Sequence, residues 1–122
     1  MNDEQTDTLA LISAYTWKPL SDFPGVSVIH LSGVLDEDRK SGRRTRLVRF
    51  EPGARTPKPL VHDYHEEVFL VSGDVTGFAD AQSFGTFTQS AYVHRPPGTL
   101  HGPLRSEGGC VMVEIQYFSD TR

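Results

Sequence analysis

Cysteine is almost absent from this 122-residue chain, and a single one, Cys110, cannot form an internal disulfide. It lies in the apolar run Cys110-Val-Met-Val, which predicts a buried small hydrophobic side chain. No stretch approaches the ~18 consecutive apolar residues of a membrane span. The acidic, polar N-terminus is also unlike a signal or transit peptide. We therefore expect a cytoplasmic protein with no membrane partner.

The chain also lacks an excess of positive charge. Its 12 Lys and Arg residues stand against 16 Asp and Glu residues, which gives a formal net charge of -4 at pH 7. Nothing in this balance favours binding to nucleic acid or to an anionic membrane surface. The length allows one hydrophobic core, so we expect a single domain over residues 1–122, with residues 1–8 disordered.

Long helical patterns are missing as well, whereas the 11 glycines and 8 prolines divide the chain into short segments. This pattern is typical of an all-β protein with about eight to ten short strands. We expect a charged turn over residues 34–44 and a further turn over residues 62–66. The expected strands include 9–15, 26–31, 45–50, 67–72, 75–79, 90–95 and 110–118. Such a series favours a barrel or a jelly roll.

Polar side chains that can bind a metal are concentrated between Gly53 and Gly73. Six residues of this stretch contain two histidines and three carboxylates, followed by the apolar run 68–71. Imidazole nitrogen and carboxylate oxygen suit a divalent transition metal. The candidate ligands are His62, Asp63, His65, Glu66 and Glu67.

A second stretch supplies a distant histidine. The expected strand 90–95 is ended by Pro96-Pro97-Gly98, and His101 follows three residues after the glycine. Together the two stretches resemble the two motifs of the cupin family, over residues 53–73 and 90–105. In the first motif His62 and Glu66 have the cupin spacing to Gly73. In the second, Pro96, Gly98 and His101 fall on motif positions.

The resemblance implies an antiparallel double-stranded β-helix, the cupin jelly-roll barrel. It also implies a metal site formed by His62, Glu66 and His101. The sequence departs from the family pattern at three positions: Leu60 replaces the first histidine, Ser90 the opening glycine and Arg105 the closing asparagine. Two histidines and one carboxylate match the facial triad of non-haem iron sites. We therefore expect Fe(II), with Zn(II), Mn(II) or Ni(II) as alternatives.

Several other side chains compete for roles in this site. His65 is a possible additional ligand or an exposed turn residue. His94 either points into the cavity, as a proton carrier or substrate donor, or packs on the outer face. Arg95 and Arg105 flank the second motif and could clamp a carboxylate or enolate, or stay exposed. The candidates for the cavity lining are Phe69, Val71, Phe78, Tyr92 and Met112.

Strand alternation lets only one of Glu66 and Glu67 face the metal, and the spacing to Gly73 favours Glu66. His30, in the expected strand 26–31, is interpreted as a surface or interface residue.

Residues 45–57 and 66–73 look like the small single-domain cupins. That group includes acetylacetone-cleaving and dihydroxyacetophenone-cleaving dioxygenases and the cupin module of zinc-binding anti-sigma factors. The resemblance implies an Fe(II) dioxygenase that cleaves a carbon–carbon bond in a small diketone-like, hydroxy-ketone or phenolic substrate. The alternatives are a metal-dependent lyase, isomerase or hydrolase, and a non-catalytic binding module. Small cupins commonly pair their barrels, so we expect a homodimer.

Overall fold

The computed structural model describes residues 12–79, 82–88, 91–100 and 102–119 of the chain. Within these residues the protein consists of two antiparallel β-sheets, and the only helix is the short 3-10 helix η2 (Ile12–Ala14). The all-β jelly-roll prediction is thus confirmed. Among the described residues, no helix is long and apolar enough to span a membrane.

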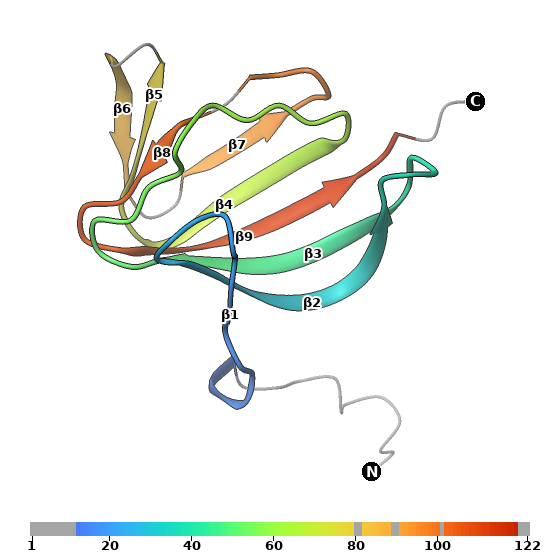
Figure 1. Ribbon diagram of the computed structural model, residues 1–122, viewed down its shortest axis with the longest axis horizontal. Coiled ribbons are helices and arrows are strands. Elements are labelled where there is room, and N and C mark those ends of the chain that lie inside the picture. Colours follow the sequence, from blue (N-terminus) through green and yellow to red (C-terminus); the bar gives the residue numbers. More distant parts are fainter. Residues whose placement is uncertain (1–11, 80–81, 89–90, 101, 120–122) are drawn as a thin grey trace.

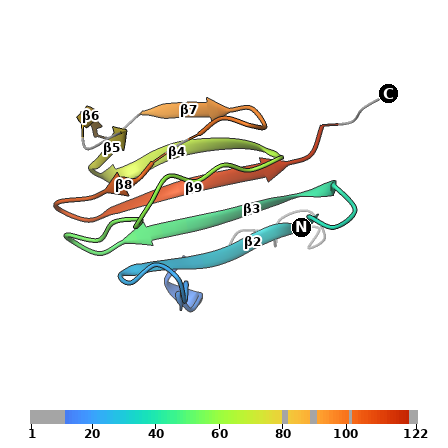
Figure 2. The ribbon, with the colours of Figure 1, turned by 45° about the horizontal axis from the view of Figure 1, so that its top comes forward.

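The larger sheet has six strands in the order β1-β2-β3-β9-β4-β7, and Figure 2 shows β2, β3, β9, β4 and β7 side by side. It contains β1 (Lys18–Pro19), β2 (Val26–Asp36), β3 (Ser41–Phe50), β4 (His65–Gly73), β7 (Tyr92–Arg95) and β9 (Cys110–Tyr117). Strand β9 lies between β3 and β4, so the C-terminal strand joins the two halves of this sheet. The central strands therefore come from distant parts of the sequence.

The smaller sheet has the order β6-β5-β8 and stands at one end of the large sheet (Figure 1). Its strands are β5 (Val75–Ala79), β6 (Gln82–Phe87) and β8 (Leu104–Arg105). The turn between β4 and β5 brings the chain from one sheet to the other. Gly73, the last residue of β4, has φ 87°, and a Cβ atom there would lie 2.0 Å from the Gly109 carbonyl oxygen. Only glycine fits this close approach of two backbones.

The core lies on the inward face of the large sheet, over β2, β3, β9 and β4. Alternate residues of these strands are apolar, which places them on one face of the sheet. Cys110 is buried there with a relative exposure of 4%, as its apolar neighbours predict. The buried cluster comprises Val26, Val48, Phe50, Val68, Leu70, Cys110 and Met112.

Three of the expected elements differ from the structure. Residues Ile12–Ala14 form the 3-10 helix instead of a strand. The charged turn is shorter than predicted, because β2 continues to Asp36 and β3 begins at Ser41, opposite it. The hydrogen bonds between paired strands join main-chain groups and do not require apolar side chains. Charged residues can therefore belong to the paired ends of β2 and β3. Strand β4 begins at His65, within the turn expected over residues 62–66.

Candidate functional site

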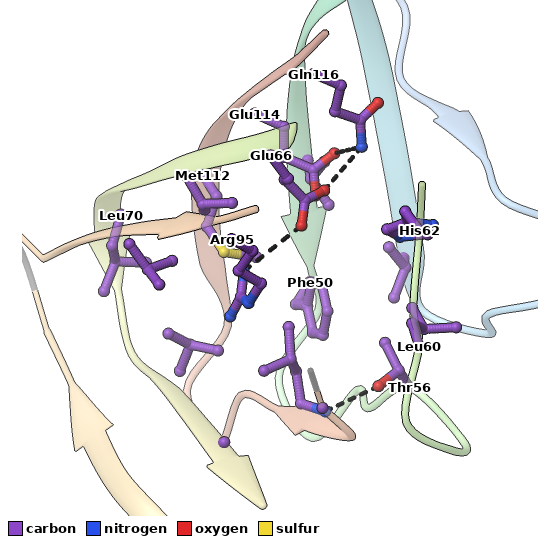
Figure 3. Close-up of a pocket in the computed structure, with 18 of the residues that line it drawn as sticks. Phe50, Thr56, Leu60, His62, Glu66, Leu70, Arg95, Met112, Glu114 and Gln116 are labelled. Atoms are coloured by element: carbon purple, nitrogen blue, oxygen red, sulfur yellow. Dashed lines mark hydrogen bonds and ion pairs between the residues drawn. The ribbon is translucent and has the colours of Figure 1, made fainter. Parts of the chain in front are cut away.

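A cavity of about 410 Å³ lies against the inward face of the large sheet. The lead-in segment before β4 contributes Thr56, Leu60 and His62 to its wall, opposite residues of β3, β4, β7 and β9 (Figure 3). Most of the lining is apolar, with a few polar groups gathered together. Small-molecule sites in proteins typically combine these features.

The strand register arranges the sheet wall of the cavity in rows. The first row crosses four strands and is entirely polar: Arg44, Gln116, Glu66 and Arg95, of which all but Arg44 line the cavity. The second row is mixed: Arg46, Glu114, Val68 and Val93. The third row is apolar: Val48, Met112 and Leu70. Since these residues share the inward face, the wall changes from charged to apolar along the strand direction.

Glu66 occupies the first row and is almost fully buried, with a relative exposure of 3%. Its Oε2 atom accepts a hydrogen bond of 2.8 Å from Nε2 of Gln116. Its Oε1 atom forms an ion pair with Nη1 of Arg95 at 3.5 Å. A buried carboxylate needs such partners, because an unpaired charge is costly away from water. Figure 3 shows Glu66 between these two side chains.

Gln116 is itself fully buried, with a relative exposure of 1%. Its amide oxygen accepts hydrogen bonds from Nε of Arg44, at 2.9 Å, and from Nη2 of the same guanidinium. Its amide nitrogen also donates to Oε1 of Glu114 over 3.4 Å. A glutamine side chain can donate and accept at the same time. Gln116 therefore connects one arginine to two carboxylates at the centre of the polar rows.

The second row contains the ion pair of Arg46 and Glu114, whose Nε and Oε1 atoms lie 2.7 Å apart. Burial raises the pKa of Glu114, the nearby charge of Glu66 raises it further, and the guanidinium of Arg46 opposes both effects. Burial alone would lower the pKa of Arg46, but Glu114 holds it above its ordinary value. The cavity wall thus carries a carboxyl group whose environment favours the protonated form.

His62 lies on the lead-in segment before β4, and its ring stacks on Tyr64 with centroids 4.6 Å apart. Burial lowers the pKa of His62, so the structure favours the neutral imidazole that can act as a ligand. His62 borders both the main cavity and a shallow surface depression beside Asp63 and Gly98. The polar end of the cavity is therefore close to the molecular surface.

The two other histidines of the candidate site lie on the opposite face of the sheet. His65 and His94 are hydrogen bonded to each other, with Nδ1 and Nε2 3.0 Å apart. The ring of His65 also stacks on Tyr117, with centroids 4.9 Å apart, and its Nε2 atom bonds to Ser119. Neither histidine lines the cavity. The structure therefore supports the outer-face alternative for His94 and removes His65 from the cavity.

The same alternation separates Glu66 from Glu67. The carboxylate of Glu67 accepts hydrogen bonds of 2.7 Å from the hydroxyls of Tyr92 and Tyr117 on the outer face. Among the expected lining residues, Met112 and Tyr92 border the cavity, although the hydroxyl of Tyr92 is bonded to Glu67. Phe69 and Val71 are exposed by 45% and 52%, and Phe69 packs on the Tyr92 ring. The side chain of Phe78 lies outside the described residues.

The two arginines of the second motif have different surroundings. Arg95 lines the cavity and is paired with Glu66. Arg105 is instead paired with Glu107, with Nη2 and Oε1 2.9 Å apart, and both side chains are exposed. Arg105 does not line the cavity. Arg105 is therefore an exposed surface residue. Arg95 remains a candidate for binding a carboxylate or enolate of a substrate.

Two of the three expected metal ligands lie within the described residues. His62 and Glu66 line the same cavity, and Leu60 lines it as well. His101 and Ser90 lie outside the described residues. Over residues 12–79, 82–88, 91–100 and 102–119, no three His, Cys, Asp or Glu side chains form a group that could hold a metal. The described donors fit a metal only if His101 completes the set.

Sequence analysis did not identify Arg46, Glu114 and Gln116 as site residues. A signal for them was present, because Glu114 and Gln116 continue the alternation that begins at Cys110 and Met112. The same holds for Arg46, two residues before Val48. Polar residues at inward positions of a strand indicate a functional or paired group. Their mutual pairing required the strand order, which the sequence pattern does not contain.

Comparisons with known proteins agree with this fold. The family model described as "ChrR Cupin-like domain" matches residues 5–118. No curated protein gives a significant match. An RmlC-like cupin from Shewanella frigidimarina is 14% identical with a TM-score of 0.67, over 91% of this chain and 90% of that one.

Two further solved structures are similar. KdgF from Halomonas sp. is 16% identical with a TM-score of 0.68, over 90% of this chain and 92% of its own. The polyketide cyclase RemF from Streptomyces resistomycificus is 12% identical with a TM-score of 0.68, over 93% of this chain and 86% of its own. At these identities the similarity indicates a shared fold.

Proposed function

Because this chain belongs to the family of ChrR cupin-like domains, we propose that it binds a divalent metal ion and a small organic molecule in its cavity. The ligands we assign to the metal are His62, Glu66 and His101. The reaction we assign is Fe(II)-dependent dioxygenation that cleaves a carbon–carbon bond in a diketone-like, hydroxy-ketone or phenolic compound. When bound, ferrous ion supplies the oxygen-dependent redox chemistry for such a cleavage.

The observation that supports this proposal is that His62 and Glu66 both line the same cavity. One is a nitrogen donor whose pKa is lowered by burial, and the other is a buried carboxylate. Imidazole and carboxylate together suit iron, manganese and zinc.

The other residues of the cavity suit the handling of an organic substrate. The apolar third row of the wall keeps water away from the body of a bound molecule. Arg95 and Arg46 lie at the polar rows and can orient an anionic oxygen of that molecule. Glu114, whose pKa is raised by burial, can hold a proton near this oxygen.

Metal content of the purified full chain tests the ligand assignment. We expect wild type to retain iron or another divalent metal, and His62→Ala, Glu66→Ala and His101→Ala each to lose most of it. The matched controls are His65→Ala and His94→Ala, which remove histidines on the outer face of the sheet. We expect both controls to retain the metal. Unchanged metal in all three ligand variants would refute the assignment.

Oxygen consumption tests the reaction. We expect the iron-loaded protein to consume oxygen with at least one compound from a panel of diketones, hydroxy-ketones and phenols. Substrate turnover without oxygen would instead favour a lyase, isomerase or hydrolase using Zn(II), Mn(II) or Ni(II) as Lewis acid.

A second candidate function is a non-catalytic binding module. The ion pair between Glu66 and Arg95 favours it, because this arginine competes with a metal for the same carboxylate. In that case the cavity binds a small molecule without converting it. Ligand binding without turnover, aerobically and anaerobically, would support this function.

A further inference from the structure

The polar rows of the cavity wall place two guanidinium groups beside the cavity. Arg46 and Arg95 line it, together with the two carboxylates Glu66 and Glu114. Arg46 pairs with Glu114, and Arg95 pairs with Glu66. A further guanidinium in the first row, on Arg44, bonds to the neutral amide of Gln116 and does not line the cavity. Both carboxylates of the polar rows are therefore already paired with a cation.

The pairing geometry leaves the arginines with further donors. A guanidinium has five N–H groups, whereas Arg46 contacts Glu114 through Nε and Arg95 contacts Glu66 through Nη1 at 3.5 Å. Both residues line the cavity. A ligand oxygen at the polar end can therefore accept hydrogen bonds from guanidinium groups, and such bonds are stronger when the acceptor is charged.

The apolar rows set the shape of the rest of the ligand. Beyond the second row the wall consists of apolar side chains, including Val48, Leu70 and Met112. Leu60, on the lead-in segment, and Leu100 also line the cavity. A polar group in this part of the cavity would lose its water without gaining a partner. The volume of about 410 Å³ is within the range for sites that enclose a small organic molecule.

We propose that the ligand of this cavity is an amphipathic organic anion. It has one negatively charged oxygen group, a carboxylate or an enolate, and an uncharged apolar body. The oxygen group lies beside Arg46 and Arg95, and the body lies against the apolar rows. This inference rests on the proposed function, since it concerns the ligand class of the same cavity.

Binding of a matched panel tests the ligand class. The probes are octanoate, the diketone octane-2,4-dione, octanamide, octylamine and acetate, measured by isothermal titration calorimetry. We expect octanoate or the dione to bind at least about ten-fold more tightly than octanamide. The neutral amide cannot accept the charge-assisted hydrogen bond that an anionic oxygen accepts from a guanidinium. Octylamine and acetate should bind more weakly still, because one has the wrong charge and the other lacks the apolar body. The better of octanoate and the dione identifies the anionic group.

Two variants locate the ligand. Arg95→Met removes a guanidinium from the cavity lining. It should weaken the binding of whichever of octanoate and the dione binds more tightly by about ten-fold. Ala91→Leu adds volume to a residue that lines the cavity and should weaken octanoate more than butyrate. The control Val113→Leu changes the outer face of β9, where Val113 pairs with Phe69, and should leave the affinity unchanged. Thermal unfolding of each variant verifies that it is folded.

Metal-free and metal-loaded protein distinguish the two proposals. Anion-selective binding to a protein that retains no metal would support the ligand class and refute the metal assignment. Equal affinity for octanamide and for both anions, in a protein that holds metal at His62, Glu66 and His101, would overturn the ligand class alone. The absence of any binding to either form would overturn it as well.

Discussion

The side-chain amide of Gln116 donates a 2.8 Å hydrogen bond to Oε2 of Glu66, across the neighbouring strands β9 and β4. Both residues are buried, and the same amide accepts hydrogen bonds from Arg44. Gln116 therefore fixes the orientation of the carboxylate that we assign to the metal. It does so from a position that no metal-binding pattern in the sequence indicates.

Replacement of Gln116 by leucine tests this relationship. Gln116→Leu removes partners from the buried Glu66 and from Arg44, so we expect the free energy of unfolding to fall by about 2 to 3 kcal/mol. Chemical denaturation measures this change. The control Glu107→Gln alters an exposed ion pair with Arg105 and should change stability by less than about 0.5 kcal/mol. Equal stability of Gln116→Leu and wild type would contradict the role of the amide.

Leu60 lines the cavity at the position where the cupin resemblance has a histidine. Leu60→His should add an imidazole next to the proposed metal site, so we expect tighter metal binding than in wild type. The matched control is Val61→His, because Val61 is exposed by 57% and does not line the main cavity. Competition with a chelator measures the affinity. An equal effect of both substitutions would contradict the placement of Leu60 beside a metal.

Gly73 and Gly53 have similar positive φ angles, 87° and 83°, but different surroundings. A Cβ on Gly73 would lie 2.0 Å from the Gly109 carbonyl oxygen, whereas a Cβ on Gly53 would meet nothing within 4 Å. We expect Gly53→Ala to cost about 1 to 2 kcal/mol through backbone strain alone. Gly73→Ala should cost more, because the clash adds to the strain. Denaturant unfolding of both variants measures the difference, and equal losses would contradict the close approach.

We expect Tyr64 to make the free energy of unfolding fall as the pH rises above 10. Burial raises its pKa above the ordinary value of 10, and the negative charges of Glu66 and Glu37 raise it further. The folded state thus favours the protonated phenol. The contribution of this protonated phenol to the free energy of unfolding is fully present below pH 10. As pH rises above 10, tyrosine ionises in the unfolded chain first, and the contribution falls by about 1.4 kcal/mol per pH unit.

Tyr64→Phe has no ionisable hydroxyl at this position. Its free energy of unfolding should therefore fall less steeply between pH 10 and 11 than that of wild type. Parallel curves for the two proteins would show that Tyr64 does not cause the dependence.

Much of the fold could be predicted from short-range patterns. The apolar runs 110–113 and 68–71 predict buried strands, and successive side chains of a strand point to opposite faces. The resemblance of residues 53–73 and 90–105 to the two cupin motifs implied the jelly-roll barrel. The alternation also predicts that Glu66 and Glu67 face opposite ways. The direction of each was decided by packing, which buries Glu66 and places Glu67 between two tyrosine hydroxyls.

The sequence by itself determined the strand periods, the glycine turns and the presence of His62 and Glu66 before a buried strand, because these depend on neighbours along the chain. The tertiary structure alone decided which side chains meet. Strand β9 is inserted between β3 and β4, and this order brings Arg44, Gln116 and Glu66 into one row. The order depends on contacts between residues far apart in the sequence, such as the bond of Arg44 to Gln116 across 72 positions. No local pattern contains such contacts, so the charged end of the cavity is a property of the folded sheet.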